Sequence, residues 1–235
     1  MAGVILQADT PTDLIVKLVQ LDISVPARAE GRTNHHTERY CLAHLMATLP
    51  EARLAFPLTL THSDKPDFLL NMPTGMVGIE HTEAVSENVA RAEFFREKGL
   101  GPDVYFPLRA RPGEPRKTAV QLRSEIKTDA PGPGWVGDAP QREWAAAMAH
   151  SIKGKMSKVM AGGFRRYPAN WLLVYDNWRV PPFDYADAVP YLVSCLKELD
   201  VSRVFDAIFI HDDSQMCEFS ETPIVHTLVK PARGS

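Results

Sequence analysis

The sequence predicts an α/β protein in which a mixed β-sheet is flanked by helices. In the second half of the chain, apolar runs of strand length alternate with longer segments of helical period. Earlier, in residues 66–83, the turn Pro73-Thr74-Gly75 separates two short apolar runs, as in a hairpin. No internal repeat is visible in the 235 residues. We therefore expect one domain over residues 1–235, with an irregular insertion at about 102–140.

Composition restricts the class of protein. Hydrophobic residues make up 45% and charged residues 23% of the chain, and the formal net charge is -3. Such a chain has no global attraction to nucleic acid, although a local basic groove remains open. Three widely spaced cysteines predict neither a zinc site nor a disulfide framework. Without a basic leader before an apolar run, or an apolar stretch of ~18 residues, we expect a soluble cytoplasmic protein.

A leading helix is expected from about Asn34 to Leu49, and Pro50 ends it. Its apolar residues are spaced three or four apart and include Cys41, Leu42 and Leu45. Glu38 lies in line with this buried stripe, where an unpaired carboxylate is costly. Either it bonds to a backbone amide or an arginine, or it faces the same site as two other acids, described next.

These two acids lie on the strands that follow a first strand at 52–60. Asp67 follows Pro66 directly, and Glu80 lies inside the next strand. Strand alternation puts Gly78, Glu80 and Thr82 on one face. The opposite face carries Val77, Ile79 and His81, so the His81 side chain is expected to pack against other residues. Carboxylates on adjacent strands can hold a hard divalent cation between them.

The remaining elements are expected in regular order, apart from an apolar segment at 12–24 whose period does not separate helix from strand. They are a helix at 85–99, the insertion at 102–140, a helix at 141–161 closed by Gly162-Gly163, a strand at 171–176, a helix at 183–199, a strand at 205–210 and weak edge strands at 215–228. From Arg109 to Lys127 the insertion has six basic residues against two acidic ones. It is either a solvated surface segment or a flap that contacts phosphates.

The lysines of the 141–161 helix lie on different sides of that helix. The buried stripe of that helix comprises Trp144, Met148, Ile152, Met156 and Val159. Lys155 lies on the flank of the stripe, Lys158 lies near its edge, and Lys153 points away. A lysine on a buried flank either extends its ammonium to solvent or directs it at an acidic site.

These residues together resemble the PD-(D/E)XK nuclease superfamily. That family carries an acid in a leading helix, then Pro-Asp on one strand and Glu-x-Lys on the next, and Glu38, Pro66-Asp67 and Glu80-His81-Thr82 are similar to those parts. The order of elements over residues 34–176 is similar to its α-β-β-β-α-β core.

One departure from the family pattern is that Thr82 stands where the family has its lysine. The stretch Ile152-x-x-Lys155-x-x-Lys158 resembles a pattern of uncharacterised bacterial members in which the lysine has moved to the following helix. Lys155 is then the expected substitute, and Lys158 is the second choice.

The resemblance implies a restriction endonuclease-like fold and a metal-dependent endonuclease that hydrolyses DNA or, as a second choice, RNA. Glu38, Asp67 and Glu80, with a backbone carbonyl near His81, would hold one or two Mg²⁺ or Mn²⁺ ions. Lys155 would orient or help deprotonate the attacking water. The alternative is a catalytically degenerate fold that binds nucleic acid or a partner protein, which Thr82 favours.

Two other histidine-containing groups are candidates for a site. His35-His36 and His44 suggest a metal cluster, but no acid neighbours the face shared by His36 and His44, and solvent-facing histidines are the favoured interpretation. The segment His211-Asp212-Asp213 follows a buried strand, where it can bind a ligand or simply form a turn. Serine-hydrolase, phosphate-loop and zinc-protease motifs are absent from the sequence.

Overall fold

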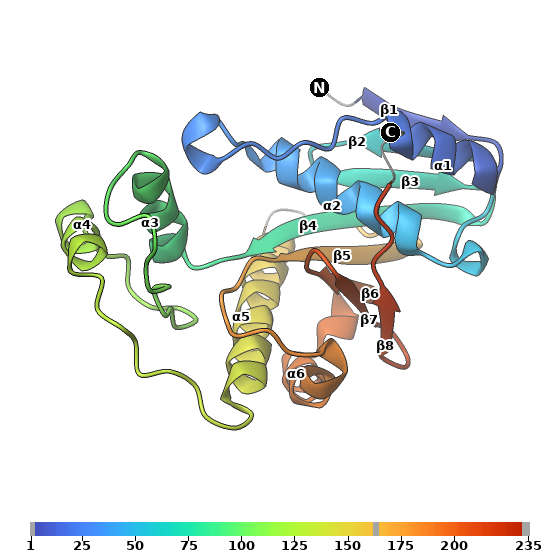
Figure 1. Cartoon of the computed structure of the whole chain (residues 1–235). Coiled ribbons are helices and arrows are strands. Elements are labelled where there is room, and N and C mark those ends of the chain that lie inside the picture. The colour runs from blue at the N-terminus through green and yellow to red at the C-terminus, as the bar shows by residue number, and fades with distance from the viewer. Residues whose placement is uncertain (1–2, 162–164, 232–235) are drawn as a thin grey trace.

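The computed structural model describes residues 3–161 and 165–231, which form an eight-stranded sheet in the sequential order β1 to β8 (Figure 1). The strands are β1 (Gly3–Ala8), β2 (Leu58–His62), β3 (Phe68–Met72), β4 (Gly75–Ala84), β5 (Ala169–Asp176), β6 (Ala207–His211), β7 (Gln215–Phe219) and β8 (Ile224–Thr227). The pairs β4–β5 and β5–β6 are parallel, and the other neighbours are antiparallel. The expected mixed sheet is therefore confirmed.

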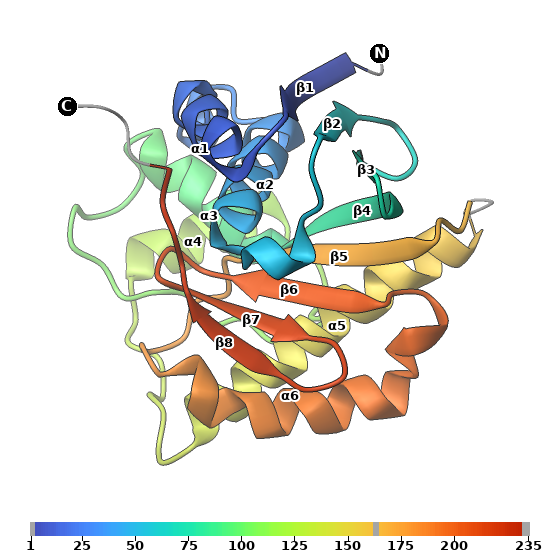
Figure 2. The same ribbon diagram turned by 90° about the vertical axis from the view of Figure 1, so that its right-hand side faces the viewer.

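Helices cover both faces of the sheet. They are α1 (Pro11–Gln20), α2 (Asn34–Thr48), α3 (Glu87–Glu97), α4 (Ala119–Thr128), α5 (Ala139–Ala161) and α6 (Tyr185–Leu199). Helices α1 and α2 bury one core against the first face, and α5 and α6 bury a second core against the opposite face (Figures 1 and 2). Because β4, β5 and β6 run parallel and in sequence, the right-handed crossover rule places the connecting helices α5 and α6 on the same face.

Several local predictions need correction. The undecided segment 12–24 contains helix α1, which Thr10 caps by accepting a hydrogen bond from the Asp13 amide. Strand β1 was not expected, and β2 begins only at Leu58, after a short 3₁₀ turn. Helix α5 ends at Ala161, and the glycines predicted to stop it lie outside the described residues.

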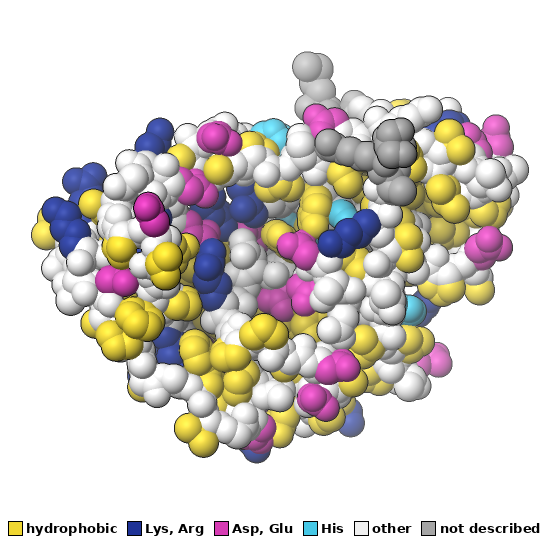
Figure 3. Space-filling model, viewed as in Figure 1, with side chains coloured by type: hydrophobic (Ala, Val, Ile, Leu, Met, Phe, Trp, Pro, Cys, Tyr) yellow, Lys and Arg dark blue, Asp and Glu magenta, His cyan; other side chains and the backbone are white. Residues whose placement is uncertain are grey.

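The insertion is more regular than its composition suggests. It contains helix α4, which begins with a capping box between Thr118 and Gln121 and lies beside α3, away from the sheet (Figure 1). Lys and Arg side chains gather on the surface near these two helices (Figure 3). Three of the six basic residues of the insertion form ion pairs with acids: Arg109 with Glu143, Arg116 with Glu87, and Lys117 with Glu125. The charge of these three residues is thus balanced by nearby acids.

Within the described ranges, no helix combines the length and the apolar character needed to cross a membrane.

Candidate functional site

The hairpin of β3 and β4 brings the two predicted acids close enough to share one lysine. Met72 pairs with Gly75 across the turn, and the φ of +132° at Gly75 is a conformation that glycine adopts readily. Asp67 immediately precedes β3, and Glu80 lies in the middle of β4, which is paired on both sides. Glu80 is therefore held by regular backbone, and Asp67 is held at the entry to a strand.

Strand alternation sends Glu80 toward α5. Its neighbour Ile79 belongs to the core under α2, whereas Leu172, the β5 partner of Glu80, belongs to the core under α5. Successive side chains of a strand point to opposite faces, so the buried Glu80 side chain lies on the α5 face. Burial raises the pKa of Glu80, and the ammonium of Lys155 opposes that shift.

Lys155 of α5 connects the two acids. Its Nζ lies 2.9 Å from Asp67 Oδ2 and forms an ion pair with Glu80 Oε2. Only 15% of the Lys155 side chain is exposed. Burial by itself would lower the pKa of Lys155, but the charge of Asp67 and the hydrogen bond with Glu80 outweigh it and raise the pKa above its ordinary value. The lysine is therefore protonated here and serves as the local cation.

The phase of α5 explains this position. Lys155 lies three residues after Ile152 and four before Val159, and both of these residues are buried against the sheet. Lys153, two residues earlier, is exposed on the other side of the helix. The structure thus brings together Asp67, Glu80 and Lys155 as the sequence predicted.

A small pocket of about 170 Å³ opens onto these three side chains. It is also lined by Asp64, Lys65, Lys158 and Val159. Two carboxylates with open space beside them suit Mg²⁺, which commonly keeps several waters and takes only one or two protein carboxylates. Asp67 and Glu80 therefore fit one such ion, provided that the Lys155 ammonium moves aside, while Lys65 and Lys158 supply positive charge at the rim.

Glu38 does not belong to this pocket, which corrects the prediction of a third acid. It lies on α2, which packs on the first face of the sheet, whereas Glu80 points to the opposite face. The Glu38 carboxylate instead contacts His35, at 3.0 Å from Nδ1, and His62, at 3.7 Å from Nε2. The buried helical stripe showed correctly that Glu38 faces the sheet but not which face α2 covers.

His81 contacts one of the two acids through its backbone. Its backbone N–H donates a 2.7 Å hydrogen bond to Asp67 Oδ2. Its side chain is buried, as expected of a packing residue, and burial lowers its pKa to about 3. The backbone of His81 thus orients the Asp67 carboxylate.

The remaining histidine predictions had mixed outcomes. His44 is buried and not solvent-facing, with Nδ1 at 2.8 Å from the Tyr40 carbonyl oxygen. His36 is partly exposed and closes the capping box of α2 with Thr33. After His211, the Asp212 carboxylate accepts hydrogen bonds from the backbone amides of Ser214 and Gln215, so this segment forms a turn.

Comparisons with known proteins leave the family open. No protein-family model matches the chain, and neither a curated protein nor a solved structure matches it. Any assignment of function therefore depends on the geometry of the residues themselves.

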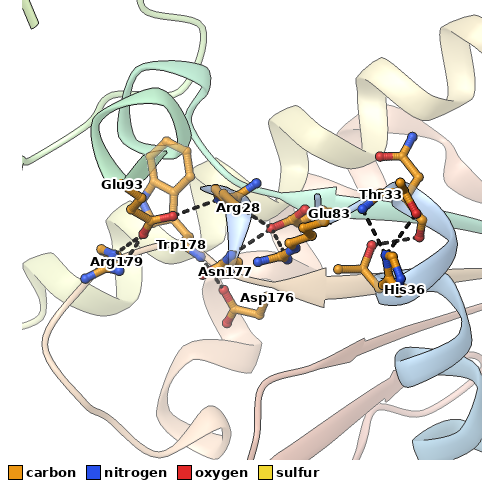
Figure 4. Close-up of polar contacts among 12 residues, drawn as sticks. Arg28, Thr33, His36, Glu83, Glu93, Asp176, Asn177, Trp178 and Arg179 are labelled. Atoms are coloured by element: carbon orange, nitrogen blue, oxygen red, sulfur yellow. Dashed lines mark hydrogen bonds and ion pairs between the residues drawn. The ribbon is translucent and has the colours of Figure 1, made fainter. Parts of the chain in front are cut away.

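Sequence reasoning missed a polar network at the carboxyl end of β4 (Figure 4). Glu83 Oε1 accepts hydrogen bonds from Arg28 at 2.8 Å, Arg32 at 2.9 Å and Asn177 at 2.7 Å. Glu93 of α3 pairs with the same Arg28, at 2.9 Å. These contacts fasten α3 and the segment before α2 to the ends of β4 and β5. Since the charges are mutually satisfied, we assign the network a structural role.

Proposed function

We propose that this protein is a metal-dependent nuclease that hydrolyses phosphodiester bonds, with DNA as its substrate. The observation that carries the proposal is the convergence of Asp67 from a loop, Glu80 from a strand and Lys155 from a helix on one pocket. A buried lysine held between two carboxylates is a costly arrangement for stability alone, because each charge must be desolvated. Ionisable groups that are buried beside a charged partner cluster at functional sites.

The order of elements supports the same proposal. Helix α2, strands β2, β3 and β4, helix α5 and strand β5 occur in the order of the α-β-β-β-α-β core of the PD-(D/E)XK superfamily, with α3 and α4 inserted between β4 and α5. Lys155 reaches Glu80 from the following helix, where the family pattern would have a lysine at the Thr82 position. We therefore propose a restriction endonuclease-like fold with a displaced lysine.

Each residue has a role that its position permits. Bound Mg²⁺ or Mn²⁺ would supply an activated water and neutralise charge on the phosphate. Asp67 and Glu80 would hold that ion, with Asp67 oriented by the His81 amide. Lys155 would orient the attacking water and stabilise the charge that develops as the P–O bond to the leaving group breaks. Lys65 and Lys158, at the rim, would bind the non-bridging phosphate oxygens or a flanking phosphate.

A nuclease fold without catalysis, acting as a module that binds nucleic acid or a protein, is the second candidate. The observation that favours it is the ion pairing itself, because Lys155 already neutralises charge on both carboxylates. In such a protein the lysine would replace the metal permanently.

Cleavage assays distinguish the two candidates. Plasmid DNA, single-stranded DNA and RNA are incubated with the protein in Mg²⁺ or Mn²⁺, beside the variants Asp67→Asn and Lys155→Met. Lys153→Met is the matched control, because Lys153 lies on the same helix but is exposed. We expect both site variants to lose activity by at least about 100-fold, since each removes a group acting at the reacting phosphate, and the control to retain it. Equal cleavage by Lys155→Met and wild type contradicts the proposed role.

Metal binding has a separate test by calorimetric titration with Mn²⁺. The wild type should bind the ion, and Glu80→Gln should bind it far more weakly because a neutral amide is a poor ligand for a hard cation. If the two titrations coincide, Asp67 and Glu80 do not form a metal site, and the binding-module candidate is preferred.

A further inference from the structure

A second group of metal-ligand side chains lies outside the pocket of Asp67 and Glu80. His35, Glu38 and His62 each offer one ligand atom, and these atoms all lie within 4.8 Å of one another. Two imidazoles and one carboxylate are a set that catalytic zinc sites use, with a fourth position left for water or substrate.

Two secondary structure elements hold the group in place. His35 and Glu38 are three residues apart near the start of α2, so they share one side of the helix. His62 is the last residue of β2 and pairs with Phe68 of β3. The His62 ring packs edge-on against the buried Phe68 ring, with centroids 5.7 Å apart, which fixes its orientation. The donors are therefore carried by rigid segments, as a specific metal site requires.

Glu38 is a buried carboxylate that contacts two histidines. Its side chain is only 12% exposed, and its ion-pair partners within the described residues are His35 and His62 alone. A divalent cation between the three side chains would satisfy the Glu38 charge and use a lone pair from each ring.

The cluster is also accessible. It faces a cavity of about 470 Å³ that is further lined by residues of β1, by Leu21, by Arg39 and by Phe68. The side chain of His35 is 69% exposed and that of His62 is 29% exposed, so an ion can enter from solvent. The cavity leaves room for a water or a small ligand at the fourth position.

We propose that His35, Glu38 and His62 form a Zn²⁺ site with an open coordination position toward this cavity. Nitrogen donors favour zinc over Mg²⁺, which prefers oxygen ligands only. The site lies under α2, on the other side of the sheet from the Asp67 and Glu80 pocket, and it shares no residue with that pocket. It is therefore independent of the proposed nuclease function.

The test is calorimetric titration of the full chain with ZnCl₂ after treatment with a chelator. Wild type should bind one equivalent at this site, and Glu38→Gln and His62→Asn should each weaken that binding by at least about 100-fold, because each removes one of only three protein ligands. His150→Gln is the matched control, since His150 is exposed on α5 and far from the cluster in sequence. Circular dichroism establishes that each variant is folded.

A second variant separates this site from the proposed nuclease site. Asp67→Asn combined with Glu80→Gln removes the other acids and should leave Zn²⁺ binding unchanged. Titration with Co²⁺ adds a geometric readout, because tetrahedral Co²⁺ with nitrogen ligands absorbs visible light strongly and octahedral Co²⁺ does not. The proposal is overturned if wild type does not bind Zn²⁺, or if the Glu38 and His62 variants bind it as wild type does. Binding that disappears in the Asp67 and Glu80 variant would assign the ion to the other pocket and would also overturn it.

Discussion

Removing the ammonium of Lys155 should destabilise the protein in a way that a divalent cation reverses. Lys155→Met preserves the length of the side chain but leaves Asp67 and Glu80 facing each other without a cation. The side chain of Asp67 is 22% exposed and that of Glu80 is 9% exposed, so water only partly stabilises the two negative charges. Breaking a buried ion pair by removing one partner costs about 3–5 kcal/mol, and the partial exposure of Asp67 places our expectation near about 3 kcal/mol.

The assay is urea unfolding at pH 7, with a chelator or with excess Mg²⁺. In chelator, Lys155→Met should be less stable than wild type by that amount, and Mg²⁺ at about 100 times its Kd should restore about 2.7 kcal/mol. Lys153→Met controls for loss of a lysine from α5 and should change stability by less than about 0.5 kcal/mol, as an exposed substitution does. If Lys155→Met matches that control in chelator, the lysine does not compensate the two acids, and the reasoning is wrong.

Three further predictions concern the surrounding structure. Gly78→Ala should lower stability by about 1–3 kcal/mol, because the new Cβ would lie 2.8 Å from the Tyr167 ring; an unchanged urea midpoint would contradict this. Burial raises the pKa of Asp176 from 3.8 to about 6, so its stabilising contribution is present at low pH and is lost as pH rises from about 4 to 6. Asp176→Asn should remove up to about 3 kcal/mol of that pH dependence, and parallel pH profiles of stability would refute the assignment. Arg53→Ala leaves the buried Glu218 side chain, which is 1% exposed, without its arginine partner. The Tm in a thermal scan should fall by at least about 6 °C. A shift below about 2 °C would show that other groups are enough to stabilise the Glu218 charge.

Local periodicity determined much of the candidate site. The proline-containing turn between two apolar runs predicted the β3–β4 hairpin, and strand alternation put Glu80 and His81 on opposite faces. Helical phase alone placed Lys155 on the sheet side of α5 and Lys153 on the solvent side. These features are set by side-chain geometry within one element, so a reader of the sequence can find them.

Only the tertiary structure decided which elements meet. The stripe of α2 shows that Glu38 faces a sheet, but the choice of face depends on how the whole chain packs, and it brought Glu38 to His62 and not to Glu80. Pairs such as Arg28 with Glu83, 55 residues apart, leave no periodic signal that could reveal them. The sequence by itself determined the nature and direction of the individual side chains, and the packing of helices on two faces of one sheet determined that they form two separate clusters.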